Sequence, residues 1–467
     1  MALPLALAAC ALKPPPSQQE LARDALPNAR VPASWSAGAG TRDAVAENWL
    51  ESFGDPRLNA LVAEALLYNT DLQAGATRVE QAVAALKIAG ASLAPAVDVL
   101  GRAAHKMRGG GGTDVTGVIV SASWELDLWG RIRYGQQAAH EQYRSAAADY
   151  AYARQSIAAL VAKSWFMAAE ASLQRGFAED AVAASEKISE VTRVRVRVGT
   201  GNNRDIALAD ASLQTYRDTL RQLRLARAQA LRALEMLAGR YPAATLDAAD
   251  TLPTPPPTVA TGIPAQLLER RPDVIAAERR VAAAFNRVGE AQAARLPRLS
   301  LTAALNWIHS TRFALKDADN PGASVGGLLT WPLFTAGALE GQVEARTAEQ
   351  KRAVAEYAAT GLKAFNEVES ALATEAALVE RERLLREAVS DNERAVRFSE
   401  VQFRVGRIDT RAVLTDQLQL YASRVQLLRV QSETLAQRVN LHLALGGGIT
   451  EPLPHPATPA SVGLNAR

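Results

Sequence analysis

The sequence predicts a mostly α-helical protein that also contributes four β-strands to a membrane. Three observations predict this fold class: two long runs without proline, four short segments of alternating apolar and polar residues, and a duplication that gives each half of the chain one run and two segments. The chain has 467 residues and 48% hydrophobic content, which is enough to bury a large core. We therefore expect two helical hairpins and two pairs of strands.

The first ten residues resemble the end of a bacterial secretory signal peptide. They read MALPLALAAC, and the last four resemble a lipobox, the motif whose cysteine receives lipid in bacterial lipoproteins. Cys10 is the only cysteine of the chain, so it cannot form an internal disulfide. We expect a covalent lipid on Cys10 and an extended tether over residues 11–45, which includes the stretch KPPPSQQ. The alternative is a buried cysteine beside an unprocessed apolar start.

The two runs without proline, residues 131–197 and 337–405, predict long helices. At 1.5 Å per residue, each could form a helix on the order of 100 Å long. Each run ends at a Val-Gly pair, and glycine permits the left-handed turn that lets the chain reverse. A second amphipathic run follows each pair, which predicts helical hairpins over residues 131–238 and 337–445. In the second hairpin, apolar residues recur mostly every three, four or seven positions, as in a coiled-coil seam: Leu362, Phe365, Val368, Leu372, Val379, Leu385, Val389, Val396 and Phe403.

The two halves of the chain repeat one another. Residues 69–95 align with residues 271–297 at a constant shift of about 202, and a period of that length indicates a duplicated domain. A proline-rich stretch, LPTPPPTVATGIP, separates the copies. The predicted parts are a signal-peptide tail with lipobox (1–10), the tether (11–45), a first repeat (46–240), a linker (241–263), a second repeat (264–446) and a flexible tail (447–467).

Four segments alternate apolar and polar side chains, which is typical of a sheet wetted on one side only. They predict strands at about 95–106, 115–128, 297–309 and 322–334. No run of 18 or more apolar residues occurs, so the sequence contains no transmembrane-helix signal. A strand of about ten residues spans a bilayer, however, and such strands escape hydropathy analysis.

If the four strands lie in lipid, they predict a trimer. An open sheet edge would leave backbone groups unpaired in lipid, and four strands cannot close a barrel. An eight-stranded barrel is filled by side chains, so twelve strands from three chains is the smallest multiple that leaves a lumen. Trp124, Trp129 and Trp331 lie toward the helix-joined ends of the strands, where an aromatic belt at the membrane interface is expected. The alternative is a soluble helical protein with a small antiparallel sheet.

Several segments resemble one known family, in the right order, over roughly residues 45–446. The chain is similar to outer-membrane efflux lipoproteins of the TolC superfamily, and among them to the NodT-like outer-membrane factors of RND-type tripartite pumps. The segments that carry the resemblance are WLESFGDPRLNALVAEALLYNTDL, SWELDLWGR, LLERRPDVIAAERRVAAA, WPLFTAGAL and AFNEVESALA.

The resemblance implies a homotrimeric channel. Twelve strands would form one transmembrane β-barrel in the outer membrane of a Gram-negative bacterium, and the long helical hairpins would form a periplasmic α-barrel. A periplasmic adaptor protein would dock on the hairpin tips and link them to a proton-driven pump in the inner membrane. Drugs or other small toxic compounds would leave through the duct without being changed. The conduit of a type I protein secretion system has the same architecture and is the alternative.

The resemblance also assigns roles to residues at the two hairpin tips. Val198, Gly199 and Thr200 in the first tip, and Val405, Gly406 and Arg407 in the second, would contact the adaptor. Each glycine is equally well explained as a helix C-cap, which is compatible with docking.

The resemblance suggests three candidates for a narrow periplasmic aperture. The family often places an aspartate just after the second tip, whereas this sequence reads VLTDQ, with Thr415 at the family position and Asp416 one residue later. One residue is about 100° around a helix, so Asp416 need not face the lumen. Asp205, after the first tip, matches a common acid of the family, and its plainer role is favourable placement near a helix N-terminus.

The sequence shows no catalytic, nucleotide or metal motif in a supporting context. A net charge of +3 does not suggest nucleic-acid binding. The motif GASVG places Ser324 in a predicted strand, where the nucleophile elbow of hydrolases would need a strand, a sharp turn and a helix. GGGG at 109–112 reads as a loop, and the five histidines lack ligand spacing. We expect no enzyme activity and no cofactor apart from the lipid; a coiled-coil scaffold without channel activity is a further alternative.

Overall fold

The computed structural model describes residues 12–37, 45, 47–104, 115–248, 250–256, 259–310 and 321–448, with the backbone alone at positions 104, 115, 309 and 310. Within these ranges the chain forms two compact units. Unit 1 contains the described residues up to Ala29, those of Thr77–Asp149 and those of Asp273–Gly361. Unit 2 contains the described residues of Arg30–Ala76 and Tyr150–Pro272 and those from Leu362 onward.

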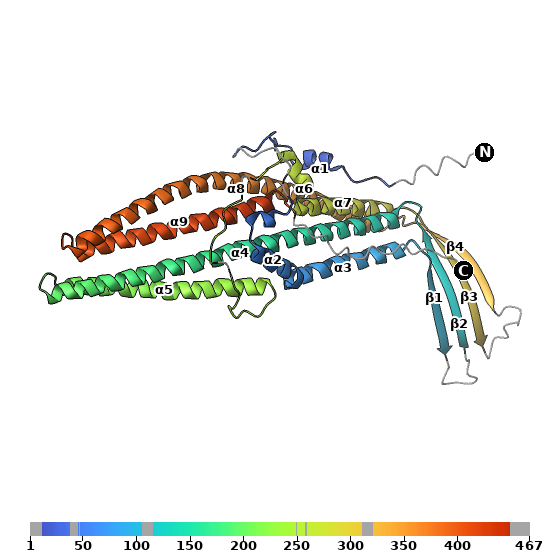
Figure 1. Cartoon of the computed structure of the whole chain (residues 1–467). Helices are drawn as coiled ribbons and strands as arrows, with labels where there is room; N and C mark the ends of the chain where they lie inside the picture. The colour runs from blue at the N-terminus through green and yellow to red at the C-terminus, as the bar shows by residue number, and fades with distance from the viewer. Residues whose placement is uncertain are drawn as a thin grey trace. The chain divides into compact units, whose positions relative to one another are not determined.

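Long helices and four strands confirm the predicted fold class (Figure 1). The helices have equal lengths in the two halves of the chain: 22, 67 and 35 residues in α3, α4 and α5, and again in α7, α8 and α9. The elements in chain order are α1 (Gln18–Ala25), η2 (Trp49–Phe53), α2 (Pro56–Tyr68), α3 (Thr70–Ala91), β1 (Ala96–Ala104), β2 (Val115–Leu126), α4 (Arg131–Arg197), α5 (Asn203–Leu237), η3 (Pro264–Gln266), α6 (Leu267–Arg270), α7 (Pro272–Ala293), β3 (Arg298–Ser310), β4 (Gly322–Thr330), α8 (Ala338–Arg404) and α9 (Thr410–Ala444).

Unit 1 holds an antiparallel sheet in the order β1-β2-β3-β4. Two strands are shorter than the sequence predicted, for local reasons. Strand β2 ends at Leu126 because Asp127 turns to cap helix α4, where its carboxylate accepts hydrogen bonds from the backbone N–H groups of Ile132 and Arg133, both at 2.9 Å. Strand β4 ends at Thr330, just before Pro332, which has no N–H to offer a neighbouring strand.

The N-terminal residues are more structured than predicted. An extended tether was expected over residues 11–45, but residues 18–25 form helix α1. Ser17 and Glu20 form a capping box, in which each side chain accepts a hydrogen bond from the other residue's backbone N–H. Leu21 is buried, so this short helix also packs by its apolar side. The expectation of an extended chain is therefore wrong for these residues.

In unit 1, helix α7 packs on the first part of α4 through small and polar side chains. The hydroxyl of Ser145, which is fully buried, donates to the carbonyl of Ala276 at 3.0 Å, and Arg280 pairs with Asp149 at 2.9 Å. Gly289 lies against Tyr134, and a Cβ there would come within 2.7 Å of the tyrosine ring. Alanine and glycine let the helices approach closely, and the hydrogen bonds fix their register.

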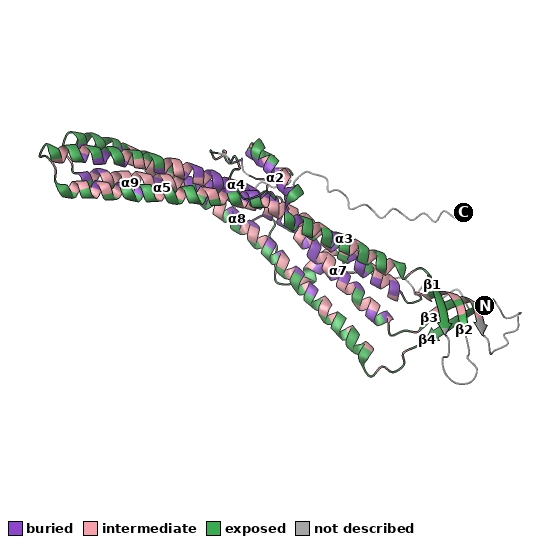
Figure 2. Cartoon of the chain, turned by 90° about the horizontal axis from the view of Figure 1, so that it is seen from below, coloured by how far each residue is buried: buried purple, intermediate pink, exposed green. Residues whose placement is uncertain are grey.

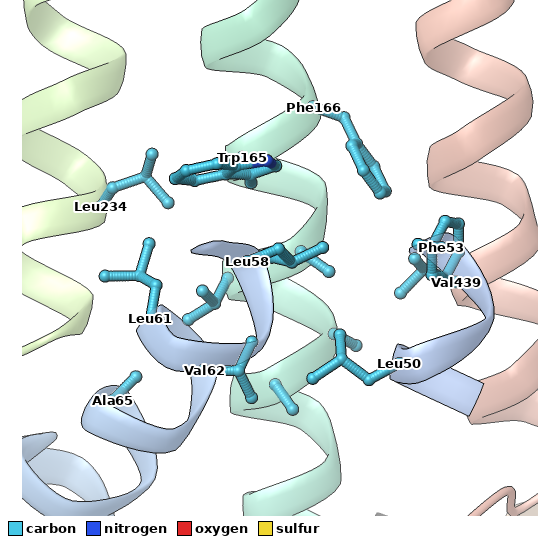
Figure 3. Packing of buried hydrophobic residues seen from close by; sticks show 14 of the residues in the cluster. Leu50, Phe53, Leu58, Leu61, Val62, Ala65, Trp165, Phe166, Leu234 and Val439 are labelled. Atoms are coloured by element: carbon cyan, nitrogen blue, oxygen red, sulfur yellow. The ribbon is translucent and has the colours of Figure 1, made fainter. Parts of the chain in front are cut away.

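Unit 2 contains the main hydrophobic core, in which η2 and α2 pack against α4, α5 and α9 (Figure 3). The side chains of Leu58, Trp165 and Phe166 are fully buried there. Asp55 links two elements of the core, because it caps α2 through the N–H groups of Arg57 and Leu58 and accepts a hydrogen bond from the Trp165 indole at 2.9 Å. None of the described helices is long and apolar enough to cross a membrane.

A histidine at the edge of this core is buried without hydrogen bonds to its ring. His442 stacks on Trp49, with 5.7 Å between ring centroids, and neither ring nitrogen has a partner among the described residues. Burial, and then the positive charge of Arg438, lower the pKa of His442 to about 4. Arg438 is itself paired with Glu375, so that carboxylate offsets part of the charge beside the ring. The side chain of His442 is therefore neutral at physiological pH.

This burial predicts a stability that depends on pH. The unfolded chain binds a proton at His442 below about pH 6.5, but the folded chain does not until about pH 4. The contribution is complete above the unfolded pKa, and the free energy of unfolding should fall by about 2 kcal/mol between about pH 6.5 and 5. His442→Phe, which keeps a ring against Trp49, should remove this part of the pH dependence. Thermal unfolding of both proteins across this range is the measurement, and equal slopes would contradict the prediction.

Candidate functional site: an apolar sheet face and two hairpin tips

The sheet presents one continuous apolar face built from all four strands. The register aligns Val97, Ala122, Ala303 and Val325 in one row across the sheet. The same face carries Val99, Gly101, Val118, Val120, Trp124, Leu126, Leu299, Leu301, Leu305, Trp307, Ala323, Gly327 and Leu329, as the alternation predicted.

The opposite face is mainly polar, and the apolar face is exposed. Asp98, Ser121 and Ser324 alternate with the apolar row on their strands. Val97 and Val325 are 66% and 88% exposed, and Figure 2 shows β1 and β4 as largely exposed. An uncovered apolar surface of this extent indicates an apolar partner or a lipid environment.

Tryptophans lie at both ends of the apolar face. Three are those predicted, at the end where strands join helices: the indole of Trp124 donates to the carbonyl of Leu93 at 3.0 Å, that of Trp129 donates to the carbonyl of Pro297 at 2.7 Å, and Trp331 follows β4. All three are partly exposed. Their rings thus combine exposed apolar surface with, for two of them, a fixed hydrogen bond.

A fourth tryptophan, Trp307, lies at the other end of strand β3. It is 45% exposed, pairs with Val118 and belongs to the apolar face. It falls within the strand predicted at about 297–309, but it was not among the predicted interface residues. Its position near the far end of that strand was the available signal. From Pro297 to Trp307 the strand rises about 33 Å, or about 25 Å at the tilt usual in barrels, which is the height of a lipid-facing apolar band.

The two hairpin tips have the same backbone structure. Helix α4 ends at Arg197 and α5 begins at Asn203, and the N–H of Thr200 bonds to the carbonyl of Arg195 at 2.9 Å. In the second tip, the N–H of Arg407 bonds to the carbonyl of Gln402 at 2.8 Å. Both are Schellman caps, and both place glycine in the left-handed region, with φ of +82° at Gly199 and +77° at Gly406.

The predicted tip residues lie at the surface. Val198 and Val405 are each 65% exposed, although valine normally favours burial. A Cβ on either tip glycine would meet nothing within 4 Å, so the backbone conformation and not packing requires glycine there.

The hairpins α4–α5 and α8–α9 contact each other just behind their tips. Phe403 is 3% exposed and packs with Ile188, Ala209 and Val413, so one small cluster joins all four helices. The guanidinium of Arg195 lies 4.9 Å from the centre of the Phe403 ring, within the range of a cation–π contact. Farther from the tips, Tyr216 and Tyr421 meet edge to face, with 5.6 Å between centroids.

The structure gives the three aperture candidates different surroundings. The carboxylate of Asp205 accepts a hydrogen bond from the N–H of Asn202, whose side chain caps α5 in return, so Asp205 has the plainer role of a helix cap. Thr415 lines a groove of about 270 Å³ between α5 and α9, together with Ser212 and Tyr216. Asp416 is half-buried on the next position of α9. Aperture roles for these residues stay predictions.

Of the other features noted in the sequence, some have a defined position in the structure and some lie outside the described residues. Cys10 and the glycine run 109–112 lie outside them. Ser324 lies within strand β4 and pairs with Ala304 of β3, which is not the setting of a catalytic serine. Among the described residues, no group of three or more His, Cys, Asp and Glu side chains is arranged to hold a metal ion.

A family model described as "Outer membrane efflux protein" matches residues 61–240 and 263–447. The chain belongs to this family. The toluene efflux pump outer membrane protein TtgF of Pseudomonas putida is 31% identical to it over 470 residues, which cover 96% of each chain. The pyoverdine export outer membrane protein OpmQ of Pseudomonas aeruginosa is 30% identical over 463 residues, which cover 95% of each.

The fold is similarly shared. The solved structure of the outer-membrane channel OprN superposes with a TM-score of 0.81 at 25% identity, covering 90% of this chain and 98% of that one. The predicted family and fold class are thus confirmed. As a member of this family, the efflux protein is an outer-membrane transport channel and not an enzyme.

Proposed function

We propose that the efflux protein works as a homotrimer whose three sheets close into one twelve-stranded barrel. The observation that carries this proposal is a four-stranded sheet with an apolar face and two open edges, β1 and β4. In lipid, each unpaired N–H or C=O group of those edges would cost roughly 2–7 kcal/mol, because hydrocarbon offers it no hydrogen-bond partner. Pairing each β4 with β1 of a neighbouring copy removes every edge.

The barrel orientation follows from the two faces. The apolar face would contact the acyl chains, with the two levels of tryptophan near the two lipid headgroup regions. The face with Asp98, Ser121 and Ser324 would then line a wet lumen. Such a lumen would offer polar and amphipathic compounds a water-filled path across the membrane.

The hairpin tips are the proposed docking site of a periplasmic adaptor protein. Two exposed valines, Val198 and Val405, stand beside tightly turned backbone, which is a shape that a partner can contact without reordering it. The adaptor would connect the channel to a proton-driven, RND-type pump of the inner membrane. Opening would separate the hairpins, and the adaptor would bind the open arrangement better than the closed one.

The proposed cargo consists of drugs or other small toxic compounds that the pump delivers. The relatives' names refer to toluene and to pyoverdine, which differ greatly in size and polarity. Because similar channels serve such different compounds, we infer that the pump selects the cargo and that the channel is a passive duct. A lipid on Cys10 would add a second attachment to the outer membrane.

One experiment tests the assembly and the anchor together. Protein extracted from its native host in detergent should have the mass of three chains by native mass spectrometry, because the sheet edges are satisfied only between copies. After the trimer is separated into single chains, each should begin at Cys10 and carry the extra mass of its acyl groups. A monomer that stays in solution without detergent would refute the shared barrel, and an unmodified Cys10 would refute only the anchor.

A further inference from the structure

The positive charge of the efflux protein is concentrated at the two hairpin tips. Residues 193–205 and 404–416 contain seven arginines and three aspartates, a net charge of +4, whereas the whole chain carries +3. The remainder of the chain is therefore slightly negative. Since the contact between Arg195 and Phe403 joins the hairpins behind their tips, the two basic segments lie close together in unit 2 (Figure 1).

Exposed arginines without an ion pair are most closely spaced at the two tips. Along the hairpins most arginines are paired, as Arg217 is with Glu186 at 2.8 Å and Arg424 with Glu393 at 2.7 Å. Exposed arginines without an ion pair among the described residues occur there too, but they are widely spaced: Arg221, Arg232 and Arg397. At the tips, the side chains of five exposed arginines make no ion pair within the part of the chain that the structure describes: Arg197, Arg204, Arg404, Arg407 and Arg411. Two of the three aspartates in these segments are engaged by the backbone, since Asp205 and Asp409 both cap helices.

Two of the five stand where the local helix disfavours a positive charge. Arg204 is the second residue of α5 and Arg411 the second residue of α9. Helix N-termini carry partial positive charge, so an arginine in the first turn is unfavourable there. By contrast, Arg197 and Arg404 lie in last helical turns, where the dipole favours them. Fold stability thus explains Arg197 and Arg404 but not Arg204 and Arg411.

We propose that the tips form a basic docking surface, which takes up an acidic loop of the periplasmic adaptor protein. This inference rests on the proposed function, which has the adaptor dock at the tips. It adds which chemical groups of the adaptor the tips would bind. In the trimer the surface would occur three times. The five arginines of each chain would then surround the periplasmic end of the α-barrel. Guanidinium groups bind carboxylates through two parallel hydrogen bonds, so they select aspartate and glutamate side chains with fixed geometry.

The test measures the affinity of the intact trimer for the purified adaptor of its own pump, at two salt concentrations. The tip variant carries R197Q, R204Q, R404Q, R407Q and R411Q. The control variant carries R217Q, R224Q, R381Q, R383Q and R386Q, which changes the charge equally but at ion-paired positions along the hairpins. At about 50 mM salt the tip variant should bind at least about tenfold more weakly than the native trimer, and at about 500 mM the difference should largely vanish because the charges are screened. The control should stay within about twofold of native.

Several outcomes would overturn the proposal. Native affinity in the tip variant, or tighter binding at low salt, would show that the adaptor loop is not acidic. Unchanged adaptor affinity together with weaker export of anionic dyes would assign the arginines to cargo instead. Thermal unfolding of the trimer controls for folding, and glutamine at Arg204 and Arg411 should not lower it. A photo-crosslinker at Val198 and Val405 tests docking at the tips separately from the acidic contact. If no crosslinks to the adaptor form, docking at the tips is itself refuted.

Discussion

Lysine in place of Val325 should prevent the efflux protein from accumulating as folded trimer in the outer membrane, while lysine in place of the adjacent Ser324 should be tolerated. Val325 is 88% exposed on the apolar face and pairs with Ala303, close to midway between the two levels of tryptophan. A lysine facing lipid near the middle of a bilayer costs about 2–4 kcal/mol, and the trimer would carry three. Ser324 pairs with Ala304 on the opposite face, where a lysine would stay in water.

The comparison is informative because the two positions are neighbours in one strand. The measurement is the amount of heat-resistant trimer in the outer-membrane fraction, followed by its unfolding in urea. Loss of trimer in Ser324→Lys with normal trimer in Val325→Lys would mean that the two faces are assigned the wrong way round. Normal trimer in both variants would show that the sheet does not contact lipid.

Alanine in place of Phe403 should make the channel open more often without its adaptor. Phe403 is the largest side chain in the cluster that joins the four helices behind the tips, and it also receives the guanidinium of Arg195. Truncating a buried phenylalanine costs about 3–5 kcal/mol, and even about 2 kcal/mol lost from the closed arrangement alone would raise the open-to-closed ratio roughly thirtyfold. The same helix provides a matched control, because Phe398 is 69% exposed and its loss should have little effect.

Single-channel current in planar bilayers is the direct measurement for this pair of variants. Phe403→Ala should conduct for a larger fraction of the time than the native channel, and Phe398→Ala should resemble the native channel. Equal currents in all three proteins would show that the hairpins open as one body, without separating at Phe403.

Helix and strand positions follow from the sequence because they depend on local periodicity. Proline-free runs and the Val-Gly pairs located α4, α8 and the two turns, and alternation assigned the apolar face of every strand. Strand ends were less accurate, since they depend on particular neighbours such as Asp127 and Pro332. Helix α1 was not predicted, because the prolines and polar residues of this stretch were taken to indicate an extended chain and the capping box at Ser17 and Glu20 was not recognised.

Side-chain environments could not be predicted in the same way. That Phe403 is buried while Phe398 is exposed, and that His442 stacks on Trp49, depend on which elements meet. Those contacts join residues far apart in the chain, and a helical period fixes which residues share a face but not what covers that face.

The sequence by itself determined the family, the repeated hairpins, the apolar side of the strands and the glycines of the tips. Each of these follows from local spacing or from long motifs. Only the tertiary structure decided which charges are paired. It brought glutamates to arginines along the hairpins such as Arg217 and Arg424, and it left Arg204 and Arg411 without an ion-pair partner among the described residues. Pairing between helices depends on distances that no one-dimensional pattern contains.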